Sequence, residues 1–304
     1  MTALVITEVA PRAGLQAERR VVPTHEKISF IDALSDCGFA RIEAGAFAPP
    51  RAVPALADAA VVLREIRRAP GVVYAAQVLD LRGMDRAIEG RVDELNLVMS
   101  CTESHNVATA RRGRAASLAR LLEIVRQAGH AGVPCNVSLS AAFGCPFEGA
   151  VRPDEVARIA LALVAGGATG VTLCDTTGMA DPAGVRRLLD RLRGALPSAA
   201  ITIHLHDTRG MALANALAAL QAGATRFDAS CGGVGGSPCA PGASGIVATE
   251  TLVHMFECMG RPTGIDLGRL LRVAARVPAL VERPLANPLL AAGARDPLHP
   301  LPAN

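Results

Sequence analysis

Two histidines, His204 and His206, stand one residue apart at the end of the apolar stretch "AITIHLH". Alternate side chains of a β-strand share a face, so both imidazoles point to one side while Leu205 points to the other. Two convergent imidazoles form part of a binding site for a divalent metal ion. The alternative interpretation is a pair of histidines that are hydrogen-bonded in the interior and bind nothing.

Acidic residues that end other apolar stretches are candidates to complete such a site. Glu43 is the only charged residue in "IEAGAF", and a buried carboxylate needs a partner, either Arg12 or Arg41, or a metal-bound water. Asp175 and Thr176 lie in "LCDTTG". They suit a role at a catalytic site or the capping of the next helix, and both interpretations stay open.

The segment "CGGVGGSPCAPGASG", residues 231–245, has four glycines within five positions. Ordering so many glycines costs backbone entropy, and a plain turn would not need them. The segment therefore predicts either a cradle for a phosphate or a flap that closes over a substrate. A flexible connector is the alternative.

The chain alternates between short β-branched stretches and stretches with helical spacing of apolar residues. This pattern predicts parallel strands joined by helices, closed into a (β/α)8 TIM barrel. An open doubly wound sheet is the alternative, although no GxGxxG turn follows an early strand. Catalytic residues of such barrels lie at the carboxyl ends of the strands. The expected strands are 3–9, 40–45, 72–78, 94–100, 134–140, 170–176, 200–206 and 226–231.

Start and stop signals define the helices between these strands. The stretch 25–38 has apolar residues on one face and ends at Gly38, and Asp181 is the expected N-cap of a helix that starts at Pro182. We expect the barrel to occupy residues 1–262. Residues 263–304 form a C-terminal helix and a Pro/Ala-rich tail, which we expect to be loosely attached or to form an oligomer contact.

The composition excludes several classes of protein. Half of the 304 residues are hydrophobic, tryptophan is absent, and the net charge is only +3, without a basic patch that nucleic acid would require. No apolar run reaches the roughly 18 residues of a membrane span. The eight cysteines, Cys135, Cys174 and Cys231 among them, lack CxxC spacing. We interpret them as reduced core thiols of a soluble cytoplasmic enzyme.

Five longer motifs point to one family. They are "EVAPRAGLQAE", against a family pattern E-V-G-P-R-D-G-L-Q, together with "FGCPFEG", "CDTTG", "HLHDTRGMALANALAAL" and "GGVGGSPCAPGASGIVATE". With these motifs in the same order, roughly residues 4–262 resemble the HMG-CoA lyase family, among the metal-dependent barrel lyases and synthases related to isopropylmalate synthase.

The resemblance implies retro-Claisen or aldol cleavage of a 3-hydroxyacyl-CoA or a related hydroxy acid, giving acetyl-CoA and a keto acid. A divalent metal would stabilise the alkoxide, and an arginine would stabilise the enolate. By position, the resemblance assigns carbonyl polarisation to Arg12, metal ligation to His204 and His206, and no organic cofactor. It assigns the remaining catalytic positions to Glu43, Asp175, Ser237 and Glu250, and contacts with substrate or CoA to Gln16, Arg19 and Thr176.

Three positions depart from the family pattern. Ala13 stands in place of a metal-binding aspartate, Ile246 in place of an asparagine ligand, and Ser237 in place of the loop cysteine, with Cys239 two positions further on. The first two changes weaken a site for Mg2+, Mn2+ or Zn2+ and make it more apolar. They favour a bulkier or less charged acyl group, or a chemistry without chelation.

The sequence therefore predicts a carbon–carbon lyase with an altered metal site, acting as a homodimer or a higher homo-oligomer on a small acyl-CoA or hydroxy-acid substrate. Two alternatives remain. One is a barrel enzyme repurposed for metal-independent hydrolysis, isomerisation or condensation, and the other is a catalytically silent binding protein.

Overall fold

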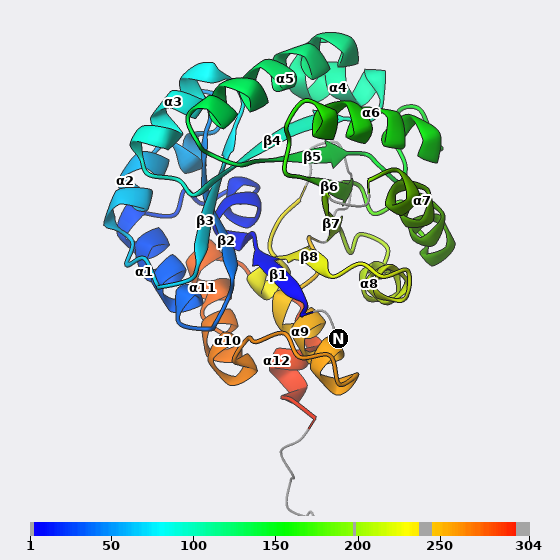
Figure 1. Ribbon diagram of the computed structural model, residues 1–304. Coiled ribbons are helices and arrows are strands. Elements are labelled where there is room, and N and C mark those ends of the chain that lie inside the picture. Colours follow the sequence, from blue (N-terminus) through cyan, green and yellow to red (C-terminus); the bar gives the residue numbers. More distant parts are fainter. Residues whose placement is uncertain (1–2, 197–198, 237–244, 296–304) are drawn as a thin grey trace, which may run out of the picture.

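The computed structural model describes residues 3–196, 199–236 and 245–295. Eight parallel strands in these ranges form a closed barrel in sequence order, in which β1 pairs with both β2 and β8 (Figure 1). The predicted (β/α)8 barrel is confirmed, and the open sheet is excluded. The strands are β1 Val5–Glu8, β2 Arg41–Phe47, β3 Val73–Val78, β4 Glu94–Ser100, β5 Cys135–Ser140, β6 Gly170–Asp175, β7 Ala200–Leu205 and β8 Arg226–Ala229.

Helices surround the barrel and extend it at the C-terminal end of the chain (Figure 1). No helix in the described ranges is both long and apolar enough to cross a membrane. The helices are η1 Ala10–Gly14, α1 Thr24–Ser35, η2 Pro54–Leu56, α2 Ala59–Glu65, α3 Leu81–Glu89, α4 Glu103–Ala110, α5 Arg114–His130, α6 Pro153–Ala165, α7 Pro182–Ala195, α8 Ala212–Gln221, η3 Cys231–Gly233, α9 Thr249–Cys258, α10 Leu267–Ala274, α11 Val277–Val281 and α12 Pro288–Ala292.

Local sequence signals set the helix ends as expected. Asp181 caps α7, because its carboxylate accepts a hydrogen bond of 2.9 Å from the amide of Gly184. After α1 the chain turns through Gly38, which has a φ of 93°, a conformation that favours glycine. Ile31 and Leu34 of α1 are fully buried, so this helix packs its apolar face on the barrel.

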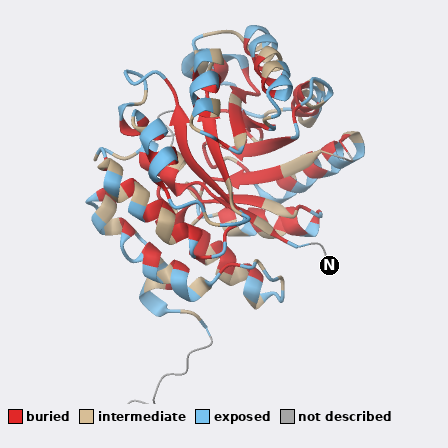
Figure 2. Cartoon of the chain, turned by 60° about the vertical axis from the view of Figure 1, so that its left-hand side comes forward, coloured by how far each residue is buried: buried red, intermediate tan, exposed pale blue. Residues whose placement is uncertain are grey.

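The core is built from aliphatic side chains between the strands and the inner faces of the helices (Figure 2). Every cysteine among the described residues is free, and burial raises the pKa of thiols such as Cys101 to about 12. Thiols held in that state are unreactive, which agrees with the prediction of reduced core cysteines.

The C-terminal segment is tied to the barrel at the loop that follows β1. The guanidinium of Arg283 donates two hydrogen bonds, of 2.8 and 2.6 Å, to the carboxylate of Glu18. Arg20 donates a hydrogen bond of 2.6 Å to the carbonyl of Leu280. In its described part the segment is therefore attached, unlike the loose tail that its composition predicts. The boundary at residue 262 stays a prediction.

A buried carboxylate fastens the loops at one end of the barrel. Glu8, at the end of β1, accepts hydrogen bonds from the amides of Ala10 and Cys231 and from the hydroxyl of Thr249, at 2.8, 2.9 and 2.8 Å. These three partners begin η1, η3 and α9. One side chain thus positions η1 relative to the glycine-rich segment.

Glu8 makes stability depend on pH. Burial raises the pKa of its carboxyl from the ordinary 4.5 to about 8. Between these two pH values the folded chain keeps a proton on Glu8 that the unfolded chain has lost. The contribution of protonated Glu8 to the free energy of unfolding is therefore complete below pH 4.5 and is lost as pH rises through about 8. We expect Glu8→Gln, which stays neutral, to flatten the fall in the free energy of unfolding over this interval, as measured by urea denaturation.

The matched control is Asp85→Asn, which alters an exposed carboxylate on α3 and should change the slope less than Glu8→Gln does. If the free energy of unfolding fell with pH equally in the wild type and in Glu8→Gln, Glu8 would not be the group that causes the fall.

Candidate active site

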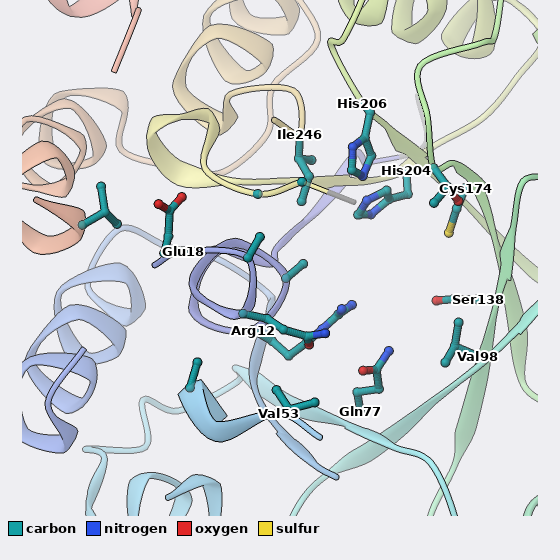
Figure 3. Close-up of a pocket in the computed structure, with 18 of the residues that line it drawn as sticks. Arg12, Glu18, Val53, Gln77, Val98, Ser138, Cys174, His204, His206 and Ile246 are labelled. Atoms are coloured by element: carbon teal, nitrogen blue, oxygen red, sulfur yellow. The ribbon is translucent and has the colours of Figure 1, made fainter. Parts of the chain in front are cut away.

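A cavity of about 1010 Å3 opens where η1, the strand ends and the glycine-rich segment meet. Arg12 of η1 and Gln77 of β3 line it, and His204 and His206 close another side (Figure 3). Val281, Glu282 and Arg283 of the C-terminal segment also line it. The cavity thus lies at the carboxyl ends of the strands, where (β/α)8 barrels hold their active sites.

Arg12 is held in place by Glu43. Its Nε and Nη2 atoms both lie 2.6 Å from Oε2 of Glu43, whose side chain is only 3% exposed. The second oxygen of Glu43 accepts a hydrogen bond of 2.7 Å from Asn96. The pair lets a guanidinium stand in a largely buried site at a defined position, since each charge compensates the other.

Polar side chains continue from this pair into the barrel. The Asn96 oxygen accepts hydrogen bonds of 3.0 Å from Asn136 and from Ser138, and the Asn136 amide also donates to Thr172 at 2.9 Å. Four strands, β2 and β4 to β6, therefore contribute to one network below the cavity. It fixes the orientation of Glu43 and, through it, of Arg12.

The two histidines lie next to each other, with ring centroids 5.3 Å apart. Nδ1 of His204 lies 3.2 Å from a carboxylate oxygen of Asp228 in β8, which orients the ring so that Nε2 is left for a ligand. Burial lowers the pKa of His206 to about 3, with smaller effects of His204 and Arg12. His206 is therefore neutral at neutral pH.

Three other predicted residues reach the same cavity. Gln16 and Arg19 are exposed at its mouth, and Thr176 lines its wall. The Thr176 hydroxyl accepts a hydrogen bond of 2.9 Å from the amide of Ala141, so it also holds the loop after β5.

Asp175 and Glu250 are buried outside the lining of the cavity. Strand alternation directs Cys174 of β6 into the cavity and Asp175 away from it. The Asp175 carboxylate instead accepts hydrogen bonds of 2.7 and 3.1 Å from the amides of Met179 and Ala180, and burial raises its pKa to about 6. It thus holds the turn before α7, whereas the cap of that helix is Asp181.

Glu250 accepts hydrogen bonds from the amide of Gly232 and from the side chain of Asn287, and burial raises its pKa. It links the glycine-rich segment to the C-terminal segment. Ser237 and Cys239 lie outside the described residues.

Sequence reasoning missed Asp228, Gln77 and Arg283. Asp228 and Gln77 carried a usable signal, because each is a polar residue within an apolar strand, as Glu43 is. Arg283 carried none, since its place at the cavity depends on how the chain returns to the barrel after α10.

Comparisons with known proteins agree with this geometry. The sequence matches the HMGL-like family over residues 3–277. The hydroxymethylglutaryl-CoA lyase YngG of Bacillus subtilis is 42% identical over 284 residues, covering 93% of this chain and 95% of that protein. The chain belongs to the HMGL-like family. The resemblance drawn from its motifs is thereby confirmed.

Other relatives match almost the whole length of the chain. The (R)-citramalyl-CoA lyase of Chloroflexus aurantiacus is 38% identical, covering 99% of this chain and 97% of that protein. An HMG-CoA lyase structure from Acinetobacter baumannii, in complex with coenzyme A and 3-methylmalate, has a TM-score of 0.94 and 43% identity, covering 99% of this chain and 100% of that one. By these relationships the chain is an enzyme of the lyase type.

The HMGL-like resemblance implies a divalent cation beside the histidines. Among the described residues no three His, Cys, Asp or Glu side chains converge to hold a metal ion. The cavity positions 13 and 246 carry Ala and Ile, whose side chains have no lone pair to donate. Mg2+ and Mn2+ prefer oxygen ligands, and a catalytic Zn2+ takes three protein ligands.

Oxygen donors introduced at these two positions should create a cation site in this HMGL-like scaffold. We expect the double variant Ala13→Asp, Ile246→Asn to bind Mn2+ with a Kd at least about tenfold lower than the wild type, as measured by calorimetric titration. The control is Ala17→Asp, which adds a carboxylate at an exposed lining position and should not gain affinity. Equal affinities of the double variant and the wild type would mean that positions 13 and 246 do not face the histidines.

Proposed function

We propose that this protein cleaves the carbon–carbon bond between C2 and C3 of a 3-hydroxyacyl-CoA thioester, releasing acetyl-CoA and a carbonyl compound. The observation that carries the proposal is the convergence of Arg12 and the pair His204 and His206 on one cavity. The names of the relatives support acyl-CoA substrates, and the neighbour from Acinetobacter baumannii holds coenzyme A and 3-methylmalate.

Arg12 is placed to stabilise the charge that develops on the thioester. When the C2–C3 bond breaks, its electron pair moves onto C2 and the thioester oxygen, which becomes an enolate. A guanidinium held by Glu43 already points into the cavity, so it meets this charge without reorganisation. Glu43 positions the guanidinium and need not contact the substrate.

His204 is placed to move the proton. With Nδ1 directed at Asp228, its Nε2 takes the proton of the C3 hydroxyl while the C3–O bond becomes a carbonyl. The same proton then returns to C2 of the enolate, which yields acetyl-CoA. The proton count balances, and neither an oxidant nor a reductant is needed.

Several sequence-based expectations belong to this proposal. We propose that the exposed residues Gln16 and Arg19 meet the CoA moiety at the cavity mouth. A homodimer or a higher oligomer that acts in the cytoplasm stays a prediction.

The first test is a mass-spectrometric cleavage assay with a panel of 3-hydroxyacyl-CoA thioesters, run with Mn2+ and with EDTA. We expect release of acetyl-CoA that EDTA does not abolish, because the donor atoms beside His204 and His206 do not complete a metal site. Release that EDTA abolishes would mean that the histidines hold a cation after all. No release from any thioester, despite binding, would favour the silent binding protein.

The role of Arg12 predicts a specific kinetic defect. Lysine at this position cannot reproduce the two contacts with Glu43, so we expect Arg12→Lys to lower kcat by about 10^2 to 10^3 with a smaller change in KM. Steady-state release of acetyl-CoA measures both constants. Arg19→Lys at the exposed mouth is the comparison, and it should act on KM more than on kcat. A defect confined to KM in Arg12→Lys would contradict the role.

A further inference from the structure

The charges around the cavity are distributed unevenly. Three arginines line it among the described residues, and two of them, Arg19 and Arg283, lie at the mouth, where Arg283 is already paired with Glu18. Deeper in the cavity, Arg12 is neutralised by Glu43. No described arginine or lysine in the inner part of the cavity therefore has a charge left for an anionic group of a ligand.

Apolar side chains occupy the space beside the reacting groups. Ile246 is 2% exposed and lies next to His204 and His206 (Figure 3). A Cβ atom on Gly235 would approach Cδ1 of Ile246 to 2.8 Å, so the isoleucine packs directly on the glycine-rich backbone. Its methyl groups are thus packed into the wall of the cavity.

Other lining residues extend this apolar surface. Ala13 follows Arg12 on η1, while Val53 and Val98 lie on other sides of the cavity (Figure 3). Moving a carboxylate from water onto such a surface, without an unpaired cation, is unfavourable because the lost hydration is not replaced. An alkyl group of similar size gains free energy there.

We propose that the substrate has an uncharged acyl end: a 3-hydroxyacyl-CoA thioester that carries alkyl groups on C3 and no carboxylate. The inference rests on the proposed lyase function and names its substrate class. Cleavage then breaks the C2–C3 bond, moves the hydroxyl proton to C2 through His204, and releases acetyl-CoA and a neutral ketone. The product differs from the keto acid that the family resemblance implies.

Binding of two uncleavable probes tests the substrate class without any turnover. Both are CoA thioethers in which a methylene replaces the thioester carbonyl, one with a 3-hydroxy-3-methylpentyl group and one with a 4-carboxy-3-hydroxy-3-methylbutyl group. They differ only in a terminal methyl or carboxylate. We expect the neutral probe to bind the full-length protein at least about tenfold more tightly in calorimetric titrations.

Substitutions at Ile246 and at Glu43 separate the effect of the apolar wall from the effect of the neutralised charge of Arg12. Ile246→Asn should reduce the preference for the neutral probe, whereas the matched variant Ile246→Val keeps an alkyl wall and should retain it. Glu43→Gln removes the charge that neutralises Arg12, so it should raise the affinity for the carboxylate probe selectively. Circular dichroism of each variant verifies that the fold is intact.

The outcomes separate this inference from the lyase proposal. Equal binding of the probes, tighter binding of the carboxylate probe, or no binding of either would overturn the substrate class. Preferential cleavage of the carboxylate thioester would overturn it while supporting the lyase. A clear preference for the neutral probe, with neither corresponding thioester cleaved, would support the substrate class and contradict the lyase.

Discussion

The parallel pairing of β1 with β8 is the constraint on which the site depends. This pairing, in the register Val5 to Arg226 and Glu8 to Ala229, closes the sheet and joins the first strand to the last. It brings η1, which carries Arg12, beside the glycine-rich segment and close to the end of β7. The carboxylate of Glu8 then fastens the starts of η1, η3 and α9 to one point. Arg12 and His204, which are about 190 residues apart in the chain, therefore share one cavity.

A charged group inside a barrel needs compensation, and here the barrel interior supplies it. The charge of Glu43 compensates that of Arg12. Asn96 donates a hydrogen bond to the second oxygen of Glu43, and Asn136 joins Asn96 to Thr172 deeper in the barrel. Such a network gains little net stability, because desolvation offsets the attraction. What it provides is orientation, since Arg12 cannot turn away from the cavity without leaving Glu43 buried and unpaired.

The same compensation limits what the cavity can bind. A guanidinium whose charge is already balanced still donates hydrogen bonds to a developing enolate, but it attracts a permanent carboxylate weakly. In the proposed reaction His204 moves the proton and Arg12 stabilises the enolate, beside an apolar wall at Ala13 and Ile246. The proposed function and the proposed substrate class thus divide two tasks within one cavity: stabilising a transient charge, and recognising the end of the substrate.

The sequence by itself determined the eight strands, the helix ends marked by Gly38 and Asp181, and the shared face of His204 and His206, because strand alternation, caps and glycine stops are local effects. It also predicted that Glu43 must have a partner, since a lone charge in an apolar strand must be compensated, but it left Arg12, Arg41 and a metal-bound water open. Tertiary structure alone decided that Asp175 turns away from the cavity, that Asp228 orients His204, and that Arg283 returns to the cavity mouth. These facts depend on which strands become neighbours and where the chain comes back, which are set by packing over the whole barrel.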